Sequence, residues 1–190
     1  MDKHGFSGQL DFRKFIPYVV SKEGRLTAGY YYTCMPYLSP KPSLSEKTLY
    51  AGQQKLVSHI SKLPNMQVRL GKLQRHGNHF VQKRVDVLFA LDLAKAAWKN
   101  EIDAAVLFAG DSDFIPAIEE ANQCGVKTVL YYYQPSFNRD LLECVTDSYE
   151  ITPELFAQFT RKNTHSSPPQ PRDMREPLGS KLKQAECERL

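Results

Sequence analysis

Two aspartates follow an apolar segment directly in the sequence LFAGDSDF, which spans residues 107–114. Only Ser112 separates Asp111 from Asp113, so two carboxylates lie close together in the chain. Like charges at short range raise each other's cost of ionisation unless a cation lies between them. Mg²⁺ suits a site with few carboxylates, where water and phosphate oxygens complete the coordination. The pair therefore indicates a divalent-metal site, whereas Asp113 alone would more simply be a helix N-cap.

Two further aspartates lie upstream in KRVDVLFALDLAKAAWKNE, residues 83–101. Asp86 begins a predicted helix that is apolar nearly all round, which predicts that this helix is buried between the sheet and its neighbours. Asp92 lies on an apolar face of the helix and needs a partner, because burying an unpaired carboxylate is costly. That partner is either Lys95, a backbone amide, or a metal shared with Asp111. Asp86 is either an N-cap or a second site residue.

Apolar runs of strand length alternate with helical patterns up to about residue 160. The predicted strands span 26–33, 67–73, 104–109 and 127–133, and the predicted helices span 11–21, 45–62, 87–99, 114–124, 137–144 and 153–159. Expected N-caps are Ser43 or Ser45, with Glu46 in the first turn, and Asp113 or Ser112 before the helix at 114. This alternation predicts an α/β fold with a mainly parallel sheet. Asp111 then lies at the carboxyl end of a strand, where ligands of parallel sheets bind.

The charge is unevenly distributed along the chain. Residues 161–190 carry seven Lys/Arg and four Asp/Glu, so they hold +3 of the formal charge of +4. Residues 65–85 contain no acidic residue, and their basic residues are Arg69, Lys72, Arg75, Lys83 and Arg84, with His76 and His79. This basic segment is either a solvated loop and hairpin or a surface that faces phosphate.

The length and composition predict one domain and a tail. Residues 1–160 are expected to form the domain, and residues 161–190, rich in proline, serine and charge, a disordered tail. No run approaches the roughly 18 apolar residues of a membrane span, and the first residues do not have the pattern of a signal peptide. The chain is therefore expected to be cytoplasmic, with no membrane partner. Its four cysteines lie far apart, which argues against a zinc site.

The sequence motifs of several enzyme classes are absent from this chain. Neither GxGxxG nor GxxxxGK[ST] occurs, which argues against nucleotide-binding enzymes, and no GxSxG supports a serine hydrolase. GDSDF also resembles the late acidic motif of haloacid-dehalogenase-type phosphatases. Those enzymes need an aspartyl nucleophile in an upstream DxD element, and none precedes residue 86. Tyrosines 30–32 and 131–133 fit buried strands better than a base-stacking surface.

Taken together, KRVDVLFALDLA and AAVLFAGDSDFIPAIEEANQCGVKTVLYYY resemble the NYN domain family, the LabA-like branch of the PIN-like nucleases. The resemblance covers roughly residues 10–159. It implies a three-layer α/β/α sandwich, PIN-like and Rossmann-like, and metal-dependent cleavage of RNA phosphodiester bonds. It also implies site residues, with Mg²⁺ or Mn²⁺ held by Asp86, Asp92, Asp111 and Asp113, and RNA, expected to be single-stranded, held by Arg75, Lys83, Arg84 and Ser112.

The chain departs from this family at its start. Members usually open with a short apolar strand that ends in an aspartate and lies in the middle of the sheet, and no such strand precedes Asp11. Without it, neighbouring strands lose their hydrogen-bonding partners, and the acidic cluster lacks one carboxylate. We therefore expect the chain to be a truncated version of a longer protein. The alternative function is a catalytically weak or inactive RNA-binding or interaction module of the same fold, and a homo-oligomer is one way to complete the sheet.

Overall fold

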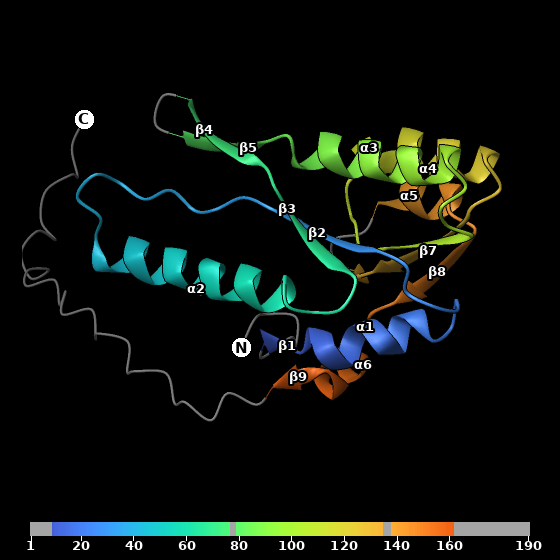
Figure 1. Ribbon diagram of the computed structural model, residues 1–190, viewed down its shortest axis with the longest axis horizontal. Coiled ribbons are helices and arrows are strands. Elements are labelled where there is room, and N and C mark those ends of the chain that lie inside the picture. The colour runs from blue at the N-terminus through green and yellow to red at the C-terminus, as the bar shows by residue number, and fades with distance from the viewer. Residues whose placement is uncertain (1–8, 77–78, 135–137, 162–190) are drawn as a thin grey trace, which may run out of the picture.

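The structure is a computed structural model that describes residues 9–76, 79–134 and 138–161 (Figure 1). The helices are α1 (Phe12–Val20), α2 (Leu44–Ile60), α3 (Val85–Trp98), the 3₁₀ helix η1 (Ser112–Phe114), α4 (Ile115–Gln123), α5 (Arg139–Cys144) and α6 (Pro153–Gln158). The strands are β1 (Gln9–Leu10), β2 (Gly29–Thr33), β3 (Met66–Leu70), β4 (Lys72–His76), β5 (His79–Lys83), β6 (Ala104–Leu107), β7 (Lys127–Tyr132), β8 (Asp147–Glu150) and β9 (Thr160–Arg161). The predicted tail lies outside the described residues beyond Arg161.

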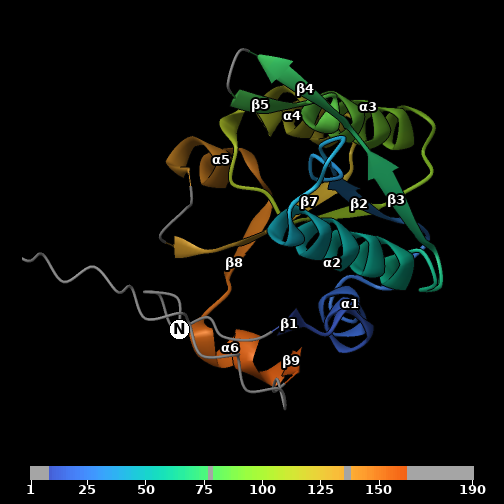
Figure 2. The ribbon, with the colours of Figure 1, turned by 90° about the vertical axis from the view of Figure 1, so that its left-hand side faces the viewer.

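These elements form the predicted α/β sandwich, with parallel strands between two layers of helices. β6, β7 and β8 pair in parallel, as do β2 and β3, whereas β4 with β5 and β1 with β9 pair antiparallel. Helices α3, α4 and α5 cover one face of the parallel strands, and α1, α2 and α6 lie on the other (Figures 1 and 2). None of the helices in the described ranges combines the length and apolar character needed to cross a bilayer.

The parallel strands form two separate sheets, and no strand within the described residues joins β2 to β6. Aromatic contacts connect the two sheets on both faces instead. On one face α1 provides two rings, Phe12 against Tyr31 of β2 at 5.9 Å between centroids, and Phe15 against Phe108, just after β6, at 5.2 Å. On the other face α3 contacts both β2 and the segment that follows β6. We call this line between the two sheets the seam.

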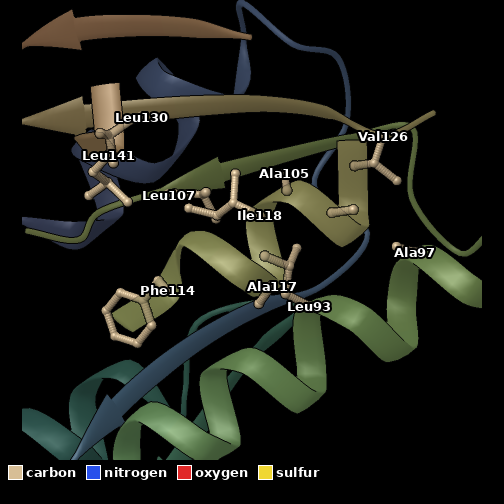
Figure 3. Close-up of a cluster of buried hydrophobic side chains, with 11 residues drawn as sticks. Leu93, Ala97, Ala105, Leu107, Phe114, Ala117, Ile118, Val126, Leu130 and Leu141 are labelled. Atoms are coloured by element: carbon tan, nitrogen blue, oxygen red, sulfur yellow. The ribbon is translucent and has the colours of Figure 1, made fainter. Parts of the chain in front are cut away.

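The main hydrophobic core lies between the three-stranded sheet and helices α3, α4 and α5 (Figure 3). Strand β7 alternates its side chains between two clusters: Leu130 points into this core, and Val129 and Tyr131 point into a second cluster with Phe15 of α1. Leu130 and Val129 are both fully buried. The continuous apolar run predicted for a parallel strand covered on both faces is therefore confirmed.

Two predictions about local structure were wrong. The predicted strand 67–73 is interrupted at Gly71, whose N–H donates to the Thr33 carbonyl at 2.8 Å. The chain then turns into the β4–β5 hairpin, so the basic segment forms a hairpin, and whether its surface faces phosphate stays a prediction. The helix α3 is not buried all round, because Val87, Leu91 and Trp98 are about 60% exposed. Its packing partners, β2, β3 and α4, leave this side of the helix uncovered by described residues.

Candidate functional site

The loop that follows β6 carries the two aspartates of the GDSDF motif. Asp111 is the N-cap of η1, because one of its carboxylate oxygens accepts a hydrogen bond from the Asp113 N–H at 3.0 Å. The predicted caps, Asp113 and Ser112, were wrong because the turn begins earlier, as a 3₁₀ helix that already contains both residues. Asp111 and Asp113 are exposed, and Ser112 is half-buried. Within the described residues, no further hydrogen bond or ion pair is made by the second Asp111 oxygen or by the Asp113 carboxylate.

Asp86 lies in the first turn of α3 and is exposed. It is not the N-cap, since that position belongs to Arg84, which has a left-handed backbone and makes no side-chain cap. Burial raises the pKa of the nearby Cys34 thiol, and the negative charge of Asp86 adds to that increase. Asp86 therefore lies near Cys34, which directly follows β2.

Asp92 lies on the opposite side of the seam from the GDSDF loop and has a protein cation as its partner. Arg69 of β3 donates two hydrogen bonds to its carboxylate, both at 3.0 Å, and the Tyr32 hydroxyl of β2 donates a third at 3.1 Å. The two protein groups predicted as partners of Asp92, Lys95 and a backbone amide, were therefore wrong. Tyr32 and Arg69 are direct neighbours in the parallel β2–β3 register, so both reach the same residue of α3. Burial, and then the Asp92 charge, raise the pKa of Tyr32 well above its usual range.

Aromatic packing connects the Asp92 network to the GDSDF loop. Phe89 of α3 contacts Tyr32 at 5.5 Å and Phe114 of η1 at 4.2 Å between ring centroids. This stack fixes the position of the acidic loop relative to α3. Within the described ranges, however, no three Asp, Glu, His or Cys side chains gather closely enough to hold a metal ion. The four predicted ligands therefore do not form one preassembled cluster.

The donor chemistry at the loop fits a hard cation, although the number of protein donors is small. Asp111 and Asp113 offer exposed carboxylate oxygens, which Mg²⁺ and Mn²⁺ accept as ligands. Asp92 is a poor candidate ligand for a metal ion, since Arg69 already neutralises its carboxylate at an ion-pair distance of 3.0 Å. An ion here would depend on water and phosphate oxygens for most of its coordination, as Mg²⁺ sites with one or two carboxylates do.

Two of the four predicted RNA-binding residues, Lys83 and Arg84, lie at the base of the hairpin, and Ser112 lies in the GDSDF loop. Lys83 ends β5, Arg84 follows it at the start of α3, and both are exposed. Arg75 lies in β4 opposite Phe80 in register, and its side chain is outside the described part of the structure. Sequence reasoning missed the role of Arg69, although its position in the acid-free segment was a signal that it could serve an acidic partner.

Comparison with known proteins agrees with this fold. The NYN domain matches residues 2–152 of the chain. A crystal structure of a protein of unknown function from Vibrio parahaemolyticus is similar in fold, with a TM-score of 0.55 and 22% sequence identity over 76% of this chain and 80% of that one. No curated protein matches. Because the matched domain spans most of the sequence, the chain belongs to the NYN domain family, a family of PIN-like nucleases.

Proposed function

We propose that this protein is a metal-dependent ribonuclease whose reaction centre is the GDSDF loop. The observation that carries the proposal is the exposed pair Asp111 and Asp113 at the carboxyl end of β6, in a chain of a nuclease family. Asp86, in the first turn of the adjacent helix, is the third carboxylate that we assign to the site. A divalent ion held there would polarise a phosphoryl oxygen and lower the pKa of a bound water.

The residues around the loop would supply binding rather than chemistry. Lys83 and Arg84 would hold RNA phosphates close to α3, and Ser112 would offer a hydroxyl between the two acids. Such contacts go to the RNA backbone and require no recognition of base sequence. We assign Asp92 a positioning role, because its bond to Arg69 fixes α3 against β3 and so sets where Asp86 lies. A cytoplasmic location and a homo-oligomer remain predictions from the sequence.

A cleavage assay tests the proposal. Purified protein is incubated with end-labelled single-stranded RNA and Mn²⁺, beside the variants Asp111→Asn and Asp103→Asn. Asp103 is an exposed aspartate at the opposite end of β6, so it controls for loss of one negative charge. We expect Asp111→Asn to lower the rate by about 100-fold or more, since a metal ion contributes several kcal/mol to such reactions. Asp103→Asn and the parent should cleave equally, and EDTA should stop both.

A second candidate function is an RNA-binding module with little or no catalysis. The observation that favours it is the Arg69–Asp92 pair, which occupies one of the four predicted metal ligands. Absence of cleavage in the parent, with RNA binding retained, would support this candidate. Equal cleavage by the parent and Asp111→Asn would contradict the assignment of the loop and indicate a contaminating nuclease.

A further inference from the structure

The β4–β5 hairpin stands apart from both parallel sheets. Among the strands that the structure describes, these two pair only with each other, and the hairpin extends away from the sandwich beyond the start of α3 (Figures 1 and 2). Gly71 holds its base close to the body, because a Cβ at this position would lie 2.7 Å from the Lys83 carbonyl oxygen and 2.8 Å from the Cys34 sulfur. The hairpin is thus fixed at its base and projects at its far end.

Two aromatic rings stack at the hairpin and remain partly open to solvent. Phe80 of β5 and Tyr37, from the loop before α2, lie with ring centroids 4.3 Å apart and planes inclined by 27°. Their exposed fractions are 41% and 39%, and Leu38, next to Tyr37 in the loop, is exposed to a similar extent. Single exposed apolar residues are common, but a stacked pair with an apolar neighbour forms a patch, and such patches mark binding surfaces.

The charge around this patch is positive and unopposed. Neither residues 34–45 nor residues 65–85 contain an acidic residue. Lys41, Lys72, Lys83 and Arg84 are exposed, and no ion pair engages them in the described ranges. Lys72 and Lys83 are direct cross-strand neighbours, which is an unfavourable arrangement for like charges, and they project from the face of the hairpin opposite to Phe80 because side chains alternate along a strand. A partner for this surface should therefore be negatively charged.

The partner should also offer flat apolar faces. Single-stranded nucleic acid has both properties, because its phosphates pair with lysine and arginine while its bases stack on aromatic side chains. The hairpin also leads directly to the acidic site. Strand β5 continues through Arg84 into α3, whose first turn carries Asp86, and Phe89 of α3 contacts Phe114 of the GDSDF loop.

We propose that Tyr37 and Phe80, with the exposed Lys41 in the same loop as Tyr37, form a stacking platform that binds the bases and phosphates of single-stranded RNA. The platform would hold the substrate before it reaches the GDSDF loop. This role rests on the proposed ribonuclease function. The interaction does not depend on base identity, because every base has a face that can stack.

Binding without cleavage tests the platform. The full chain carrying Asp111→Asn is titrated, in EDTA, into a fluorescein-labelled 12-residue oligouridylate and a matched 12-residue abasic strand, and anisotropy gives the Kd. Phe80→Ala and Tyr37→Ala should each weaken uridine binding on the order of tenfold and leave abasic binding unchanged. Trp98→Ala is the control, since Trp98 is a still more exposed aromatic at the far end of α3, about 20 Å from the hairpin end of that helix.

A charge variant gives an independent measurement. Lys41→Ala should weaken binding of both oligonucleotides and reduce the salt dependence, by roughly 0.7 in the slope of log Kd against log salt for one lost phosphate contact. Phe80→Tyr, which keeps the ring, should retain the affinity, whereas Phe80→Leu, which keeps only apolar bulk, should lose it. Thermal unfolding of each variant checks that the fold is intact.

Two results would overturn the platform. The first is unchanged uridine binding in both alanine variants, or an equal loss for the abasic strand. The second is sedimentation that shows a dimer of the parent and a monomer of Phe80→Ala, which would make the patch an interface between two copies. Failure of the ribonuclease is distinguished by the cleavage assay, because a platform that binds RNA without metal is compatible with no cleavage at all.

Discussion

The two parallel sheets differ sharply in how deeply they are buried. In the three-stranded sheet, Val129 and Leu130 are fully buried, as is Ile118 of the covering helix α4. In the two-stranded sheet every residue of β2 is only half-buried, Leu70 of β3 is 50% exposed, and the long helix α2 has one buried residue, Ile60. The difference teaches that apolar burial stabilises one half of the protein, whereas ion pairs, helix caps and the aromatic contacts at the seam stabilise the other half and the hairpin that follows it.

The largest expected effect on stability comes from a leucine-to-alanine substitution, which we compare between the two sheets. Leu130→Ala should lower the free energy of unfolding by about 2–5 kcal/mol, because it leaves a cavity in the core. Leu70→Ala removes the same atoms from a half-exposed position, and we expect a change within about 0.5 kcal/mol. Urea unfolding followed by circular dichroism measures both. Equal losses would show that the two halves share one core and that the comparison is wrong.

The next effect concerns the close contact at the base of the hairpin. Gly71→Ala would place a methyl group 2.7 Å from a backbone oxygen, and we expect a loss of about 1–3 kcal/mol as the hairpin moves. Gly52→Ala, in the middle of α2, is the matched control, since nothing lies within 4 Å of its added Cβ. It should increase stability by about 0.5–1 kcal/mol through helix propensity. A neutral Gly71→Ala would mean that the hairpin is not fixed at its base.

The Arg69–Asp92 ion pair connects α3 to the two-stranded sheet, where few apolar side chains are buried. A double-mutant cycle with Arg69→Ala and Asp92→Asn should give a coupling energy of about 1–2 kcal/mol, because Asp92 is largely shielded and accepts two bonds from one guanidinium. Thermal or urea unfolding of the four proteins measures it. A coupling near zero would leave the seam aromatics as the main contact between α3 and the two-stranded sheet.

The smallest effect concerns the start of α2. Ser43 and Glu46 form a capping box, and Ser43→Ala should lower stability by about 1 kcal/mol. Hydrogen bonds from the Ser43 backbone and the Ser39 hydroxyl hold the pKa of Glu46 below its ordinary 4.5. This contribution is complete above pH 4.5 and is lost as the pH falls through the lowered pKa. Glu46→Gln should therefore reduce the loss of stability that the parent shows as the pH falls below 4.5. An equal loss in both proteins would contradict the role given to the Glu46 carboxylate.

Much of the fold could be predicted because local periodicity reports burial. The helix predicted over 11–21 is α1, and the strand predicted over 104–109 is β6, shortened at its carboxyl end. Strand β8, with the sequence DSYE, was missed because it lies at the edge of its sheet and alternates half-buried with exposed residues. A polar edge strand carries no apolar run that sequence reasoning could detect.

The candidate site was predictable in position but not in its interactions. The rule that loops after parallel strands carry function located Asp111 and Asp113 after β6. The partner of Asp92 could not be predicted, because Arg69 lies 23 residues away and reaches it only through the register of β2 with β3. The stacked pair of Tyr37 and Phe80 was missed for the same reason, since their segments are distant in sequence.

The seam between β2 and β6 has a consequence for amide hydrogen exchange. Each of these strands has a described partner on one side only, so every second N–H points toward the seam and lacks a strand acceptor among the described residues. Deuterium should therefore enter alternate amides of β2 and β6 rapidly, while β7, paired on both sides, resists labelling along its paired length. A strand inserted from another chain would slow the fast positions in both strands together.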